Sequence, residues 1–99
     1  MKTAQIIITG KVQNVGFRNF AKRKADENKI KGYVKNAADG SIEILAGGDD
    51  FLMEKFIREC RRGPLLASIK DIKIDYLKNK IKKEVSADSE DSKWFEIKL

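Results

Sequence analysis

Apolar residues recur along the chain with two different periods, and the order of these periods predicts the elements of the fold. Residues 4–9 include three successive isoleucines, a pattern typical of an interior strand with apolar residues on both faces. From Phe17 onward, apolar residues recur at helical spacing with Lys and Arg between them, which predicts an amphipathic helix over residues 17–28. Residues 10–16 are small or turn-forming, so the chain begins with a strand, a turn and a helix.

A β-hairpin is predicted in the middle of the chain. Residues 32–36 and 41–46 both have strand character, and the second segment alternates so that one face points toward the core. Between them, Asp39 and Gly40 form the Asp-Gly pair that provides the positive φ angles of a tight hairpin turn. Residues 47–48 are both glycine and predict the end of the second strand.

A second helix is expected after this break. Asp49 and Asp50 are candidate N-caps, and Gly63 followed by Pro64 predicts the end of the helix. One face of the helix carries an apolar stripe, and four phenylalanines at helical spacing also predict core positions. The residues expected in the core on these grounds are Leu52, Met53, Phe56, Ile57, Cys60, Phe17, Phe20 and Phe51.

The last third of the chain predicts two more strands. Apolar residues alternate over residues 68–76 and again over residues 94–99, where Trp94 lies on the polar face, and residues 77–92 are mostly charged and predict an exposed connection. The resulting order is βαββαβ plus a terminal strand. This order predicts a single α+β domain over residues 1–99. Its fold would be a ferredoxin-like sandwich with two helices on one face of an antiparallel sheet of four or five strands.

Composition excludes several classes of enzyme. The chain has 99 residues and no histidine, which excludes Ser-His-Asp triads, Cys-His dyads and imidazole-bound metal sites. Its single cysteine, Cys60, cannot form an intrachain disulfide, which favours a reducing compartment. No apolar run approaches the roughly 18 residues of a membrane span, and the first residues do not resemble a signal peptide. We therefore expect a cytoplasmic protein that makes no membrane contact.

The charge balance favours anionic partners without identifying one. The chain has 21 basic and 15 acidic residues, which gives a net charge of +6 and a pI near 9.5. Such a field attracts nucleic acids, acidic membranes or phosphorylated metabolites, and it also serves solubility alone. The choice among these partners depends on local motifs.

The turn between the first strand and the first helix is a candidate anion site. Main-chain N–H groups at a helix N-terminus lack intrahelical partners, and the helix dipole adds partial positive charge there. Gly16 and the turn-tolerant Asn14 allow the chain to curl so that several N–H groups converge. Arg18, in the first helical turn, would bind the oxygens of the anion, and phosphate is the natural occupant. The alternative on pattern alone is that this glycine-bearing segment is only a turn.

Three segments resemble a known family in order and spacing. The acylphosphatase signature G-x-V-Q-G-V-x-F-R is closely matched by residues 10–18, which read Gly-Lys-Val-Gln-Asn-Val-Gly-Phe-Arg. Residues 32–36 and the following Asp-Gly turn resemble the family's second signature, and residues 63–67 resemble the segment after its second helix. The similarity spans about residues 5–76. Asn14 departs from the signature, which usually has glycine there, but Asn tolerates a left-handed backbone.

The resemblance implies that the chain hydrolyses a small-molecule acyl phosphate to a carboxylate and inorganic phosphate. It implies that Arg18 binds the phosphate and that Asn36 orients the attacking water. It also implies a phosphate cradle formed by the main-chain N–H groups of Gln13, Asn14, Val15, Gly16 and Phe17. A departing carboxylate needs no general acid. We expect no metal and no cofactor, because fixed N–H groups and one Arg can stabilise the transition-state charge. We also expect a monomer with no nucleic-acid partner.

Two alternatives come from other classes of protein. RNA-binding RRM domains share the βαββαβ order and a basic charge, but they read bases with aromatic residues on their first and third strands. Residues 6–9 and 41–45 carry no aromatic side chain, which argues against that alternative. The other alternative is a catalytically silent domain that binds a ligand or a protein, and the departure at Asn14 is its only support.

Overall fold

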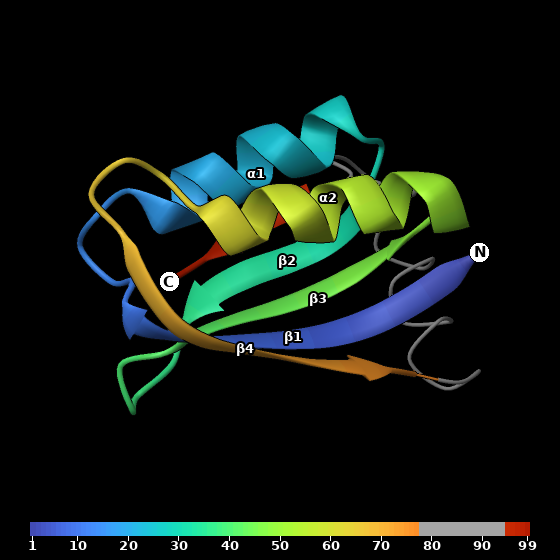
Figure 1. The fold of residues 1–99 in the computed structure, drawn as a ribbon. Helices are drawn as coiled ribbons and strands as arrows, with labels where there is room; N and C mark the ends of the chain where they lie inside the picture. Colours follow the sequence, from blue (N-terminus) through green and yellow to red (C-terminus); the bar gives the residue numbers. More distant parts are fainter. Residues whose placement is uncertain (78–94) are drawn as a thin grey trace.

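A computed structural model describes residues 1–77 and 95–99, and its elements follow the predicted order (Figure 1). Two helices and five strands build the βαββαβ arrangement with one further strand. In chain order they are β1 (Lys2–Lys11), α1 (Phe17–Glu27), β2 (Lys31–Asn36), β3 (Ile42–Gly48), α2 (Asp50–Arg62), β4 (Ser68–Tyr76) and β5 (Phe95–Lys98). The ferredoxin-like α+β class predicted from the sequence is confirmed.

The strands form one sheet in the order β4-β1-β3-β2-β5. Neighbouring strands from β4 to β2 are antiparallel, whereas β5 pairs in parallel with β2. In the sheet, β5 lies beside β2 and not beside β4, the strand that precedes it in the chain. The prediction of an antiparallel sheet is therefore wrong at one edge, because the sheet of the described residues is mixed, with its one parallel pair between β2 and β5. Strand β1 pairs on both sides, as its run of isoleucines predicts.

Both helices cover the same face of the sheet, and the core lies between the two layers (Figure 1). Every second residue of the strands points into this core, and each helix contributes one apolar stripe. The completely or almost completely buried residues of the strands include Ala4, Ile6, Ile8, Val34, Ile42, Ile44 and Phe95. Those of the helices include Phe17, Ala21, Ala25, Met53, Phe56 and Cys60. Burial raises the pKa of the Cys60 thiol, in keeping with its expected role as core filler.

Two further details of the sequence prediction are wrong. Phe51, expected in the core, is 71% exposed, because it lies in the first turn of α2 and outside the stripe that faces the sheet. Strand β3 continues through residues 47–48, where a break was expected. Gly47 pairs with Thr3, and a Cβ on Gly48 would lie 2.8 Å from the Ile30 side chain. Both glycines therefore belong to the strand, and Gly48 lies against the end of the Ile30 side chain.

The ends of α2 agree with the sequence prediction. The Asp49 carboxylate accepts hydrogen bonds from the main-chain N–H groups of Phe51 and Leu52, at 3.0 and 3.2 Å, and so caps the helix. At the other end, Gly63 adopts a φ of 67°, a conformation that glycine reaches without steric cost.

Leu52, which was expected in the core, is only half-buried, because it lies at the margin of the apolar stripe of α2.

Most of the charged connection predicted over residues 77–92, together with Trp94, lies outside the described residues. Within residues 1–77 and 95–99, neither helix has the length and apolar character needed to cross a lipid bilayer.

Candidate active site

The turn between β1 and α1 contains two residues in left-handed conformations. Asn14 has a φ of 61° and Gly16 a φ of 79°. Glycine adopts such angles freely, and asparagine is among the few other residues that tolerate them. Together they curl the chain tightly between Lys11, the last residue of β1, and Phe17, the first residue of α1.

The N-terminus of α1 lacks the usual protein partners. Its N-cap residue is Gly16, which provides no side-chain hydrogen bond, and the first turn contains no acidic residue. Helix α2 differs, because the Asp49 carboxylate caps it and Asp50 lies in its first turn. The first N–H groups of a helix have no intrahelical acceptor, and the helix dipole favours an anion near them. The start of α1 is therefore available to an anion that is not part of the chain.

The Gln13 side chain joins this turn to the β2–β3 hairpin. Its Nε2 atom donates hydrogen bonds to the main-chain oxygens of Ala37, at 2.8 Å, and Ser41, at 3.0 Å. The hairpin is further ordered by the Asp39 carboxylate, which accepts hydrogen bonds from the Ser41 hydroxyl and N–H groups at 2.6 and 3.0 Å. The side-chain and main-chain hydrogen bonds from Ser41 lower the pKa of Asp39. These contacts keep Asn36, the last residue of β2, beside the turn.

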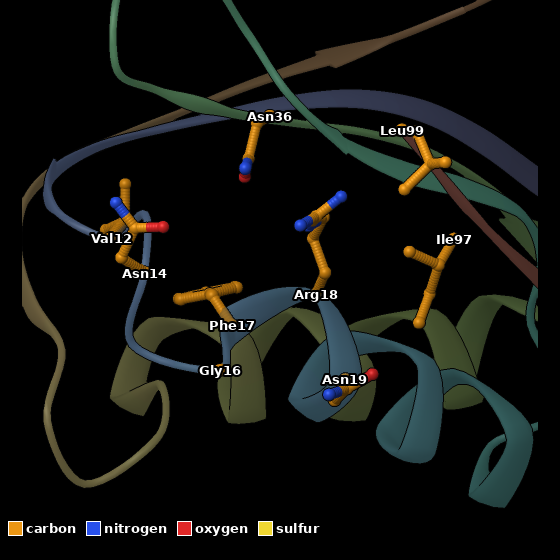
Figure 2. Close-up of a pocket in the computed structure, with 9 residues that line it drawn as sticks. All are labelled: Val12, Asn14, Gly16, Phe17, Arg18, Asn19, Asn36, Ile97 and Leu99. Atoms are coloured by element: carbon orange, nitrogen blue, oxygen red, sulfur yellow. The ribbon is translucent and has the colours of Figure 1, made fainter.

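A pocket of about 170 Å³ opens between the turn, the end of β2 and strand β5 (Figure 2). This volume is well below the range of about 300–1,000 Å³ that is common for drug-sized ligands, and it suits a small group. The residues that line the pocket are Val12, Asn14, Gly16, Phe17, Arg18, Asn19, Asn36, Ile97 and Leu99. Of these described residues, only Arg18 has a charged side chain.

Arg18 and Asn36 face the same space from opposite layers of the fold. Figure 2 shows the Arg18 side chain rising from α1 toward β2, where the Asn36 carboxamide points down toward it. Arg18 donates from Nη1 to the main-chain oxygen of Lys98 at 3.1 Å, which orients the guanidinium at the mouth of the pocket. Among the residues that the structure describes, none forms a hydrogen bond with the Asn36 carboxamide. The pocket thus combines a positively charged donor with a carboxamide available to a ligand or a water.

The structure brings most of the sequence-predicted site residues into one pocket. Asn14, Gly16, Phe17, Arg18 and Asn36 all line it.

The side chains of the other two predicted residues point elsewhere. Gln13 bonds to the hairpin, as described above, and Val15 packs against the hydrophobic core. Their predicted contribution comes from main-chain N–H groups, and this contribution stays a prediction.

The sequence prediction did not include Val12, Asn19, Ile97 or Leu99 among the site residues. Val12 lies inside the signature segment, and Asn19 follows Arg18 directly, so proximity along the chain could have indicated both. Ile97 and Leu99 were expected only as apolar residues of the last strand. Their position at the pocket depends on the parallel pairing of β5 with β2, for which the sequence has no local signal.

Comparisons with known proteins agree on one family. The acylphosphatase family profile matches residues 4–91. The chain is 42% identical to an acylphosphatase of Archaeoglobus fulgidus over 75% of its own length and 83% of that protein. It is 39% identical to an acylphosphatase of Methanocella arvoryzae over 75% of its own length and 84% of that protein.

A solved structure gives the same result for the fold. The crystal structure of the Bacillus subtilis acylphosphatase superposes with a TM-score of 0.84 at 32% identity, and the match covers 100% of both chains. Fold, signature segments and relatives therefore agree, and the chain belongs to the acylphosphatase family.

Proposed function

We propose that this protein hydrolyses the carboxyl-phosphate bond of acyl phosphates, releasing a carboxylate and inorganic phosphate. The observation that carries the proposal is the single pocket to which the uncapped start of α1, Arg18 and Asn36 all contribute. Membership of the acylphosphatase family, whose relatives bear the name of this activity, adds independent support.

The phosphoryl group is proposed to bind at the turn before α1. The main-chain N–H groups of residues 13–17 form the cradle, and Arg18 binds two phosphoryl oxygens through its planar guanidinium. In a loose phosphoryl-transfer transition state, negative charge lies largely on the non-bridging oxygens. Fixed N–H groups and one guanidinium are well suited to stabilise that charge, since they need no reorganisation during the reaction.

Asn36 is proposed to orient the attacking water. Its half-buried carboxamide faces Arg18 across the pocket and can accept a hydrogen bond from a water opposite the bond that breaks (Figure 2). The water oxygen forms a bond to phosphorus, the bridging P–O bond breaks, and its electron pair leaves with the carboxylate. One water proton passes to a phosphoryl oxygen of the substrate. Carboxylic acids have a pKa of about 4, so the leaving group requires no general acid.

Hydrolysis of benzoyl phosphate in buffer containing EDTA tests this function. We expect the wild-type protein to accelerate hydrolysis in the presence of the chelator. The Arg18→Ala variant should lose about 10²–10³-fold in kcat and also bind substrate more weakly, because it removes a donor to the phosphoryl group. Asn36→Ala should lower kcat by about 10²-fold with little change in KM, because the water is not part of substrate binding.

Arg23→Ala is the matched control for Arg18, because Arg23 is an exposed cation on α1 that does not line the pocket. We expect this variant to retain wild-type kinetics. If the wild-type protein is no faster than buffer alone, the catalytically silent domain becomes the better interpretation. Full activity in Arg18→Ala and Asn36→Ala would leave hydrolysis standing but overturn the roles proposed for these two residues.

We further propose that one chain is sufficient for activity. In this proposal, residues 1–99 form a single domain that acts as a monomer and needs no metal or cofactor, since main-chain N–H groups and Arg18 supply the charge stabilisation. The RNA-binding alternative is not favoured, since β1 and β3, the strands that would read bases, carry no aromatic residue.

A further inference from the structure

The pocket has an apolar side that the proposed chemistry does not use. Ile97 is half-buried and Leu99 is fully exposed, and both line the pocket from β5 and its end. Val12 and Phe17 are also apolar, but each is only 1% exposed, because its side chain is buried in the hydrophobic core. Ile97 and Leu99 are therefore the apolar side chains of the pocket that offer surface to a ligand.

The geometry of β5 keeps these two side chains next to the proposed phosphate-binding group. Side chains alternate along a strand, so Ile97 and Leu99 lie on one face and Lys98 on the other. The Lys98 ammonium lies 4.2 Å from the centre of the Tyr33 ring. The main-chain oxygen of Lys98 accepts the hydrogen bond from Arg18. Figure 2 accordingly shows Ile97 and Leu99 beside Arg18, on the side away from Asn14.

The two sides of the pocket match the two ends of an acyl phosphate. A phosphoryl group gains nothing from an isoleucine or a leucine, since it needs donors and positive charge. An acyl group is joined to the phosphoryl group through a single oxygen, so it must lie within a few bond lengths of Arg18. An apolar acyl group that covers Leu99 removes apolar surface from water, and this contact is favourable in proportion to the area buried.

We propose that Ile97 and Leu99 form a subsite for the acyl group, so that the protein prefers acyl phosphates with an aromatic or branched aliphatic acyl group over those with a small or polar one. The inference rests on the proposed hydrolysis and adds the class of substrate. Acetyl phosphate and benzoyl phosphate represent the two kinds of substrate, because they share the bond that breaks and differ in apolar area.

The test compares kcat/KM for these two substrates in the wild-type protein and in Leu99→Ala. We expect kcat/KM for benzoyl phosphate to fall about threefold to tenfold further than that for acetyl phosphate, a range that suits the loss of a partly covered leucine contact. Differences in intrinsic reactivity cancel, because each substrate is compared with itself between two proteins. Leu99 is fully exposed, so its replacement should spare the fold.

Leu65→Ala is the matched control, because Leu65 is 96% exposed and does not line the pocket. The ratio of the two kcat/KM values should not change in this variant. Ile97→Val provides a second, milder change from the same side of the pocket and should shift the ratio in the same direction. Competitive inhibition by inorganic phosphate reports on the phosphate side alone, and Leu99→Ala should change it less than it changes the KM for benzoyl phosphate.

The outcomes separate the subsite from the hydrolysis on which it depends. If the wild-type protein hydrolyses neither substrate faster than buffer, the proposed function is wrong and the subsite is overturned with it. If both substrates are hydrolysed but Leu99→Ala and Ile97→Val leave the ratio unchanged, only the subsite is overturned. A wild-type protein that prefers acetyl phosphate after correction for the uncatalysed rates would also contradict it.

Discussion

Asn14 holds a left-handed backbone conformation in the turn that forms one side of the pocket. For most side chains, this conformation costs roughly 1–2 kcal/mol, because Cβ approaches the following carbonyl oxygen. Asparagine tolerates it better than most, so the turn keeps its curl at a position where the family signature usually has glycine. The Asn14 side chain nevertheless lies at the rim of the pocket, where glycine would leave open space (Figure 2).

Replacement of Asn14 separates backbone from side-chain effects. We expect Asn14→Gly to keep the free energy of unfolding within about 0.5 kcal/mol of the wild type, since glycine adopts the same conformation without strain. Its kcat for benzoyl phosphate should rise by about threefold, a change in barrier of roughly 0.65 kcal/mol, because the rim of the pocket becomes more open. Asn14→Ala should instead lose about 1 kcal/mol of stability. Thermal unfolding and steady-state kinetics measure both effects, and unchanged kinetics in Asn14→Gly would mean that the Asn14 side chain is harmless.

Local patterns in the sequence predicted the polar side of the site but not the apolar side. Asn14, Gly16 and Arg18 belong to one short segment, so turn chemistry and the start of a helix are enough to place them together. Asn36 was added only through the resemblance of residues 32–36 to the second signature of the family. Ile97 reaches the pocket only through the pairing of β5 with β2, which joins segments that lie far apart in the sequence. No short-range period in the sequence encodes such a contact.

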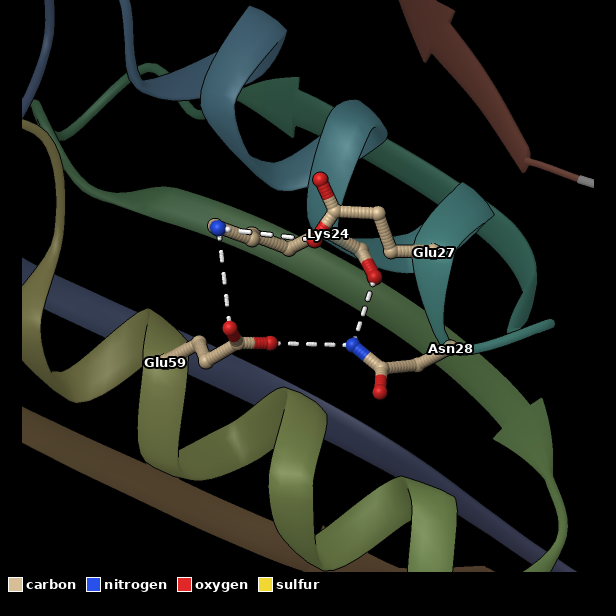
Figure 3. A network of polar contacts seen from close by, with 4 residues as sticks. All are labelled: Lys24, Glu27, Asn28 and Glu59. Atoms are coloured by element: carbon tan, nitrogen blue, oxygen red, sulfur yellow. Dashed lines mark hydrogen bonds and ion pairs between the residues drawn. The ribbon is translucent and has the colours of Figure 1, made fainter.

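At the scale of elements, α1 and α2 are joined by a polar bridge (Figure 3). The almost completely buried Asn28 donates from Nδ2 to the Lys24 main-chain oxygen at 2.8 Å and to the Glu59 carboxylate at 2.9 Å. The Lys24 ammonium lies 3.5 Å from the same carboxylate and 3.4 Å from that of Glu27. Burial alone would raise the pKa of Glu59, but the hydrogen bond from Asn28 and the charge of Lys24 outweigh it and lower the pKa. The bridge therefore favours the ionised form of Glu59 in the folded protein.

The lowered pKa of Glu59 predicts a pH dependence of stability. Between the lowered folded pKa and the unfolded pKa of about 4.3, the unfolded chain binds more protons, so stability rises with pH. The contribution of the ionised Glu59 to the free energy of unfolding is fully present above the unfolded pKa and is lost as pH falls through the folded pKa. We expect Glu59→Gln to be about 1 kcal/mol less stable than the wild type at pH 7, and this difference should shrink as pH falls through the folded pKa of Glu59.

Urea unfolding of both proteins across this pH range measures the difference. Glu54→Gln is the matched control, because Glu54 is an exposed carboxylate on α2 and has no ion pair within the described part of the chain. A constant difference between wild type and Glu59→Gln from pH 3 to pH 7 would show that the charge of Glu59 does not stabilise the bridge.

At the scale of the whole molecule, the pocket joins segments from the beginning, the middle and the end of the chain. The turn after β1, the last residue of β2 and strand β5 each provide part of its lining. These segments meet only when the sheet has formed, because β5 reaches the site through its pairing with β2. We therefore expect the site to form and to be lost together with the fold, as in a single cooperative domain.

This coupling predicts that inorganic phosphate stabilises the whole protein. At ten times its Kd, a ligand that binds only the folded state adds about 1.4 kcal/mol to the free energy of unfolding. For a domain of this size, that gain raises Tm by about 6–11 °C. Because Arg18 is the one charged side chain among the described residues of the pocket, Arg18→Ala should lose most of this shift, whereas Arg23→Ala should keep it. Scanning calorimetry with phosphate, and with chloride at equal ionic strength, measures the shift. An equal shift in Arg18→Ala, or two separate transitions, would contradict a site built by one cooperative fold around this guanidinium.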